Sequence, residues 1–142
     1  MSRYLGDSFL LPALNPDNKP WFTSGSLQVQ FCTSCKAAQH PPEDVCIQCR
    51  CRELEFRTMP GEGTVESAVE VQFPVHPLLK DRVPYNVAVI SIDGAPGCNA
   101  LGNVVNKASN EVEIGQRVRA IYEEATCPDT GEKMLIPNWE AI

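Results

Sequence analysis

Two short motifs, Cys32–Cys35 (CTSC) and Cys46–Cys49 (CIQC), decide how this chain is organised. Two residues between the cysteines of each motif let a tight turn aim both sulfur atoms at one point, and ten residues separate the motifs. Four thiolates placed in this way complete a tetrahedral site for Zn²⁺, with Zn–S bonds of about 2.3 Å. We therefore expect a small zinc ribbon with one structural Zn²⁺ per chain, held by Cys32, Cys35, Cys46 and Cys49.

Other roles for these cysteines stay open on the residues alone. Disulfides are disfavoured, because the first residues contain no apolar segment that would direct the chain to an oxidising compartment. A thioredoxin-like site would need one CxxC motif beside a βαβ unit, whereas this chain has two motifs and no such pattern. Cys51 could replace Cys49 as the fourth ligand, and His40 in the spacer is a weaker alternative. A closed four-cysteine site leaves no position for water, so the zinc is expected to be structural.

Composition limits the class of protein. The 142 residues are 43% hydrophobic and include 12 prolines, which favours short strands and shaped loops over a helical protein. No apolar run approaches the roughly 20 residues that cross a bilayer. Because no signal segment is visible, we expect a cytoplasmic protein.

The residues before the first cysteine predict an arm and a short helix over residues 1–25. The first 14 residues show no periodicity, and we expect an arm that is disordered alone or laid against a partner. Asn15 can cap a helix and Gly25 fits its end. The helix carries Trp21 and Phe22, which either pack on the ribbon or form a docking surface for another subunit.

Alternation of apolar and polar residues predicts two strands around the cysteines. In residues 26–31 three apolar residues alternate with polar ones, so Gln30 is expected to face solvent. Residues 54–57 alternate in the same way after the last cysteine motif. These strands bracket a zinc ribbon over residues 26–59, which is too small to bury a core without its metal.

Residues 60–142 predict a second unit made of strands. Further strands are expected over residues 63–73, 85–92, 99–105, 116–123 and 133–136. In the first of these, Val65, Val69, Val71 and Phe73 are expected on one face. The strand at 85–92 is apolar on both faces, as in a central strand. Five strands with unequal loops favour an OB-fold barrel, with a β-sandwich as the alternative.

The sequence contains no recognisable catalytic machinery. It has no nucleophile motif, HExxH, phosphate-binding loop or GxGxxG, and its only histidines, His40 and His76, each stand beside a proline. Residues 26–59 carry four basic and four acidic residues, and residues 60–142 carry six basic against twelve acidic residues. Nucleic-acid binding depends on neutralising phosphates, so this balance opposes it.

The order of the features resembles a known family. It is carried by Pro16-Asp17-Asn18 and Trp21-Phe22 before the cysteine motifs, Pro41-Pro42 in the spacer, and Gly61-Glu62-Gly63, Pro84-Tyr85 and Ile114-Gly115 afterwards. This order resembles the acyl-CoA-associated proteins that have an N-terminal rubredoxin-like zinc ribbon and a C-terminal OB-fold. The resemblance covers nearly the whole chain after residue 12, and departs at Glu43, where the family more often has arginine. It implies a mainly β protein with a short N-terminal helix, a zinc ribbon and a five-stranded OB-fold barrel.

The resemblance also implies a function. Members of this family are small subunits of thiolase-like enzymes, which perform condensation, acyl transfer or retro-aldol cleavage of acyl-CoA thioesters in lipid or steroid metabolism. By resemblance, this chain is a non-catalytic zinc-binding subunit of a hetero-oligomer. We expect no activity from the chain alone, and acyl-CoA at or near its surface. The alternatives are a free-standing acyl-CoA-binding or shuttle module and, third, a nucleic-acid-binding OB-fold protein.

The loop at residues 74–84 is the first candidate for contacts with the partner or CoA. Leu78 and Leu79 stand between prolines, where alternation offers them no barrel interior, and Lys80 and Arg82 follow. An apolar pair beside basic groups suits both a protein interface and phosphates. The alternative is that the leucines fold back over the barrel end. The other candidate contacts are Arg117 and Arg119 for a phosphate, and Trp21 and Phe22 for the partner.

Overall fold

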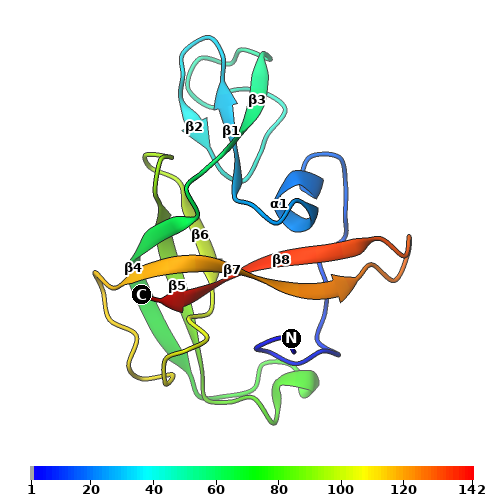
Figure 1. Cartoon of the computed structure of the whole chain (residues 1–142), viewed down its shortest axis with the longest axis vertical. Helices are drawn as coiled ribbons and strands as arrows, with labels where there is room; N and C mark the ends of the chain where they lie inside the picture. Colours follow the sequence, from blue (N-terminus) through cyan, green and yellow to red (C-terminus); the bar gives the residue numbers. More distant parts are fainter. Residues whose placement is uncertain (1) are drawn as a thin grey trace.

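The computed structural model describes residues 2–142 and contains two antiparallel sheets (Figure 1). The elements in chain order are α1 (Lys19–Thr23), β1 (Gln28–Cys32), β2 (Ala38–Gln39), β3 (Leu54–Thr58), β4 (Glu62–Val71), the 3₁₀ helix η1 (Pro77–Leu79), β5 (Tyr85–Ile92), β6 (Asn99–Gly102), β7 (Arg117–Thr126) and β8 (Lys133–Ala141). The smaller sheet has the order β2-β1-β3 and the larger one β6-β5-β4-β7-β8. We call the part that contains the smaller sheet the ribbon and the part that contains the larger sheet the barrel.

The larger sheet closes on itself. Val104, just after β6, forms a parallel bridge with Trp139 of β8, so the two ends of the sheet meet. Gly102 makes this closure possible, because a Cβ atom there would lie 2.6 Å from the indole ring of Trp139. Trp139 itself is completely buried. This arrangement is the five-stranded OB-fold barrel that the strand pattern predicted.

The ribbon and the barrel share one hydrophobic core. Leu27 precedes β1, Val29 and Phe31 belong to it, and all three are buried in the same cluster as Ile90 and Trp139 of the barrel. The ribbon therefore has apolar support beyond its cysteines, which its small size alone did not suggest. Pro60 and Gly61 connect the two parts between β3 and β4.

The N-terminal arm lies on the barrel of its own chain (Figure 1). The Tyr4 amide donates a hydrogen bond of 2.6 Å to the carboxylate of the buried Glu123 on β7, and the Tyr4 hydroxyl is 3.2 Å from Nδ2 of Asn86 on β5. The Arg3 guanidinium donates to the backbone oxygens of Phe9 and Leu10. These contacts order the arm without a partner.

The start of the short helix differs from the prediction. The Asn15 side chain does accept backbone hydrogen bonds, from the amides of Asp17 and Asn18, but it closes a turn before the helix. The helix α1 begins at Lys19, with Pro20 in its first turn. Gly25 follows the helix with a φ of +72°, as predicted for its end.

A β-bulge in β4 overturns the predicted alternation. The pairing of β4 with β5 shifts register between Val65 and Ser67. One extra residue moves every later side chain to the opposite face, so Val65 is buried whereas Val69 is 57% exposed. Phe73, predicted on the same face as Val65, lies beyond the end of β4 and is also exposed.

The last strand is longer than predicted. We expected a strand at residues 133–136, and β8 instead runs to Ala141. Pro137 lies within it opposite Tyr122 of β7, and at this position β8 is paired on one side only, which is compatible with a proline in a strand. Among residues 2–142, no helix is long and apolar enough to cross a membrane.

Candidate metal centre and partner surface

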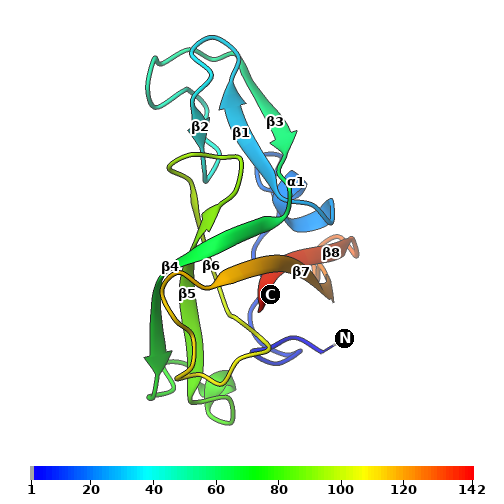
Figure 2. The ribbon, with the colours of Figure 1, turned by 60° about the vertical axis from the view of Figure 1, so that its left-hand side comes forward.

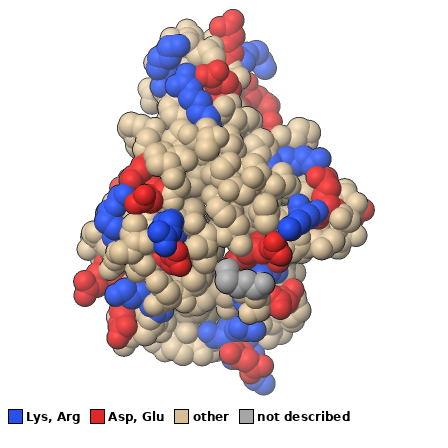
Figure 3. Space-filling model, viewed as in Figure 1, with Lys and Arg blue, Asp and Glu red and all other residues tan. Residues whose placement is uncertain are grey.

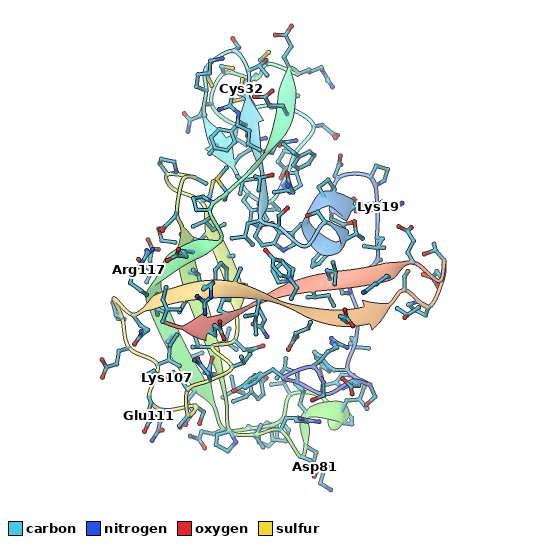
Figure 4. The ribbon with its side chains drawn as sticks, viewed as in Figure 1. Lys19, Cys32, Asp81, Lys107, Glu111 and Arg117 are labelled. Atoms are coloured by element: carbon cyan, nitrogen blue, oxygen red, sulfur yellow. The ribbon has the colours of Figure 1, made fainter. Side chains whose placement is uncertain are left out.

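The four cysteines of the two motifs converge at the end of the ribbon remote from the barrel. Figure 4 places Cys32 at this end and Asp81 at the opposite end of the molecule. The sulfur atoms of Cys32, Cys35, Cys46 and Cys49 all lie within 4.8 Å of one another. The distance between Sγ of Cys32 and Sγ of Cys49 is 3.6 Å, and that between Cys35 and Cys46 is 3.5 Å.

These distances fit a tetrahedral metal site. Four sulfurs bound at about 2.3 Å to one Zn²⁺ lie about 3.8 Å apart along each edge of the tetrahedron. A disulfide would require about 2.05 Å between sulfurs, and all seven cysteines are free thiols. The donor set is therefore suited to a structural metal.

The two motifs fold into equivalent turns. In the first, the Cys32 amide donates to the Ala37 oxygen and the Lys36 amide donates to the Cys32 oxygen. In the second, Cys46 and Cys51 stand in the places of Cys32 and Ala37, with the Cys46 amide donating to the Cys51 oxygen. Cys51 thus occupies the position after the turn, which explains why Cys49 and not Cys51 joins the cluster.

A second feature of these turns is an unusual backbone conformation. Lys36 and Arg50, each directly after a motif, have φ angles of +67° and +64°. Glycine often occupies this position because it adopts positive φ without steric cost. The ribbon therefore holds two non-glycine residues in the left-handed region to complete its turns.

Backbone amides point at the sulfur atoms and favour the thiolate form. The amides of Cys49 and Gln48 donate to Sγ of Cys46 at 3.4 and 3.3 Å, and these bonds lower the pKa of Cys46 to about 6. The Cys35 amide, 3.4 Å from Sγ of Cys32, likewise lowers the pKa of Cys32. Metal ligands must be thiolates, so these amides favour the ligand form at the first cysteine of each motif. At Cys35 and Cys49 the amides of Ala37 and Cys51 act in the same direction, but the neighbouring sulfurs and burial outweigh them and raise the pKa.

Two buried glutamines position the second motif. Gln30 was predicted to face solvent, but it and Gln39 are both buried. Gln39 donates to the side-chain oxygen of Gln30 and to the Val45 oxygen, and accepts from the Ile47 amide. Gln30 exchanges two hydrogen bonds with the backbone of Glu43. The glutamines therefore replace a hydrophobic core in this half of the ribbon and hold the segment that carries Cys46.

Trp21, a candidate partner contact, and His40, a candidate metal ligand, pack on each other beside the ribbon. The Trp21 and His40 rings stack with centroids 4.1 Å apart, and Trp21 also contacts the shared core. Burial lowers the pKa of His40, which favours the neutral ring. His40 is not part of the cysteine cluster. Phe22, the other aromatic residue of α1, is half-buried, so the use of either residue by a partner stays a prediction.

The barrel carries an apolar surface on the outside of β4, β5 and β6. The cross-strand pairs Val69–Val87, Val71–Tyr85 and Val89–Leu101 share this side of the sheet, since Ala88 and Ile90 between them point into the core. We call Val69, Val71, Val87, Val89 and Leu101 the outer apolar face.

No charged residue occupies the outer apolar face. Ser67 and Ser91 are its polar neighbours along the strands, and Leu101 is 72% exposed. Figures 1 and 2 both show the three strands on the side of the barrel away from α1. Val69 is also exposed, whereas Val71, Val87 and Val89 are half-buried. A run of apolar residues on the outer side of a sheet is typical of a protein interface. The sequence signal was present in the two apolar sides of residues 85–92, which we interpreted as burial within the chain.

The loop at residues 74–84 agrees with the prediction only in part. Leu79 belongs to η1 and is 2% exposed, so it packs inside the protein and is not available to a partner. Leu78 is exposed. Arg82 contacts the arm through the Tyr4 oxygen at 3.5 Å, and neither Lys80 nor Arg82 forms an ion pair within residues 2–142.

The other two basic candidates are paired with carboxylates. Arg117 contacts Asp93 with two hydrogen bonds of 2.9 and 2.5 Å and lies 3.5 Å from Glu62. The Arg117 guanidinium lowers the pKa of Asp93 through these hydrogen bonds. Arg119 pairs with Glu140 at 2.6 Å. Figure 3 shows basic and acidic groups interspersed on the visible face, with no continuous basic patch.

The ribbon and the barrel together define the class of protein, a four-cysteine ribbon joined to an OB-fold. Residues 56–123 match the family model described as the C-terminal OB-fold domain of ChsH2. A chain of a solved structure described as an Ltp2-ChsH2(DUF35) aldolase is 29% identical, with a TM-score of 0.75, and the match covers 92% of this chain and 98% of that chain. No curated protein sequence matched. These findings confirm the resemblance seen in the order of the motifs and the fold that it implied.

Proposed function

We propose that this chain is a non-catalytic subunit that binds and supports a thiolase-superfamily enzyme acting on acyl-CoA thioesters. The observation that carries the proposal is the match over 92% of the chain to a structure described as an Ltp2-ChsH2(DUF35) aldolase. The ribbon and barrel correspond to that chain over nearly its whole length, so this chain is expected to bind a similar type of enzyme subunit. A retro-aldol or thiolase-type partner is thus the leading candidate.

The metal in this proposal is one Zn²⁺ held by Cys32, Cys35, Cys46 and Cys49. Zinc bound by four thiolates supplies cross-links between the two turns and no chemistry, since no position is left for a substrate. The residues of the chain then orient the turns through the buried glutamines and the shared core.

We place the partner on the outer apolar face. This surface consists of apolar residues in a chain whose net charge is −6, and a partner would remove the exposed Val69 and Leu101 from water. Leu78, which is exposed in the loop at residues 74–84, is a further candidate contact for the partner. For CoA, Lys80 and Arg82 are the better candidates, because Arg117 and Arg119 are already paired with carboxylates.

The test is reconstitution with a defined enzyme subunit. The tagged chain is isolated from its host, the co-purifying subunit is identified by mass spectrometry, and both chains are then produced separately and mixed. We expect acyl-CoA turnover by the mixture and none by this chain alone. Turnover by this chain alone would refute the non-catalytic role. A monomer that binds acyl-CoA without any enzyme subunit would refute the proposal and favour the shuttle module.

Variants locate the surface within the complex. Val69→Glu/Leu101→Glu is expected to fold and to lose the partner, whereas Ile114→Glu, which changes an equally exposed residue before β7, is expected to bind normally. Unchanged binding by the double variant would exclude the outer apolar face as the surface that binds the partner. Lys80→Ala and Arg82→Ala are expected to raise the KM for the CoA thioester while the complex stays intact.

A further inference from the structure

The strand β3 forms an open edge of the ribbon. It is the last strand in the order β2-β1-β3, and no other element runs beside its outer side in Figures 1 and 2. Four of its five residues, from Glu55 to Thr58, are exposed. An unpaired edge presents free backbone donors and acceptors to any strand that can align with it.

The hydrogen bonds at both ends of β3 show which residues point outward. The Met59 amide donates to the Leu27 oxygen, and the Thr33 amide donates to the Glu53 oxygen. Hydrogen-bonded positions alternate in an antiparallel pair, so the backbone N–H and C=O groups of residues 53, 55, 57 and 59 point toward β1. The backbone groups of Leu54, Phe56 and Thr58 therefore point to the open side.

The side chains of β3 are complementary to a second copy of themselves. The strand reads Leu54-Glu55-Phe56-Arg57-Thr58, with opposite charges on the two sides of Phe56. We propose that two copies of the chain associate through β3, antiparallel about a two-fold axis at Phe56. In this register Glu55 of each copy lies opposite Arg57 of the other, and Phe56 lies opposite Phe56.

Only this register satisfies both the backbone and the charges. The outward residues are even-numbered, so a symmetric pairing that keeps them opposite each other and aligns at least three residues of β3 must be centred on residue 55, 56 or 57. A centre at Glu55 or at Arg57 would put like charges face to face, which is destabilising. The centre at Phe56 also links the Glu55–Arg57 ion pair of each chain, at 2.6 Å, into a group of four charges.

The pairing joins the two ribbon sheets into one sheet of six strands, with the two barrels at opposite ends because the strands run antiparallel. The contact is small compared with the roughly 1,600 Å² of a standard interface, so the dimer should be weak. It is expected at concentrations between about 10 µM and 1 mM. The proposal does not rest on the proposed function, since it concerns the isolated chain.

The first experiment is sedimentation of zinc-loaded protein across that concentration range. Wild type is expected to dimerise, whereas Glu55→Arg and Arg57→Glu are each expected to weaken the dimer at least tenfold. An equimolar mixture of the two variants is expected to dimerise again, because each arginine then meets a glutamate of the other chain. A wild type that stays monomeric at about 1 mM would overturn the proposal, as would single variants that dimerise normally or a mixture that does not recover.

A second measurement covers the case in which the charge variants fail to fold. Phe56→Cys places two thiols across the axis with Cα atoms about 5.5 Å apart, within the range of a disulfide. Thr58→Cys is the matched control, because its two copies would lie about 14 Å apart. Cross-linked dimer under mild oxidation is expected for the first variant and not for the second. Equal cross-linking of both, or of neither, would overturn the proposed register.

Discussion

Replacing Gln39 tests whether buried polar contacts build the metal centre. Gln39→Met keeps the length of the side chain and removes three hydrogen bonds, to the Gln30 side chain, the Val45 oxygen and the Ile47 amide. Each such bond contributes about 1 kcal/mol net, so the ribbon should lose about 3 kcal/mol. Further loss is limited at Ile47, since that residue lies at the surface and its amide can reach water.

The same loss should appear in metal affinity. In a ribbon where metal binding and folding are one equilibrium, 3 kcal/mol corresponds to about 100-fold weaker Zn²⁺ binding, at about 1.4 kcal/mol per tenfold. The assay is competition of the protein with a chromogenic chelator, followed by urea unfolding of the zinc-loaded form. Gln28→Met is the control, because the Gln28 amide contacts only Ser26 and Thr58 near the surface, and it should lose under about 1 kcal/mol.

The result that would refute this reasoning is specific. If Gln39→Met binds Zn²⁺ within about threefold of wild type, the hydrogen bonds do not position the second motif. The shared core on the other side of β1 would then be sufficient to hold the ribbon.

Three further predictions concern the ligands, the pH dependence and the closure of the barrel. Cys46→Ser should yield metal-free or insoluble protein, whereas Cys51→Ser should retain one equivalent of zinc by mass spectrometry; a metal-free Cys51→Ser would contradict the assigned ligand set. Burial lowers the pKa of His40 below its ordinary 6.5, so the neutral ring stabilises the fold above that pH and this contribution is lost as the pH falls below it. His40→Gln should therefore reduce the loss of stability that thermal unfolding shows between pH 7 and pH 5. Gly102→Ala should lower the free energy of unfolding by about 1–3 kcal/mol, because its methyl group overlaps the buried Trp139; unchanged urea unfolding would show that the barrel can yield there.

The metal centre and the type of barrel could be predicted from the sequence because their signals are local. The CxxC spacing fixes the shape of each turn within five residues, apolar–polar alternation persists over most of β7, and β5 is an apolar run bounded by turns. The ribbon–barrel order then agreed with the family resemblance and with the structural match. What these signals share is that each depends on neighbours in the chain.

The errors fall where distant residues decide the outcome. Gln30 was placed toward solvent by alternation, but its hydrogen bonds are to Gln39 and Glu43, which approach only in the folded ribbon. The bulge between Val65 and Ser67 leaves no mark in the alternation, because Val65, Val69 and Val71 keep the spacing of one face although the first points inward and the other two point outward. Leu79 is buried by a short 3₁₀ helix that the proline-rich sequence of this loop did not predict.

The strand β5 connects these errors to the proposed partner. Its sequence is apolar on both faces, which in a single chain indicates burial on both sides. In the fold, one side enters the barrel with Ala88 and Ile90, and the other lies beside Val69, Val71 and Leu101 of the neighbouring strands. The bulge in β4 turns Val69 outward to join this surface. Apolar side chains exposed to water have a free-energy cost that is removed when a second protein covers them, so the pattern in β5 supports the proposal that the partner binds the outer apolar face.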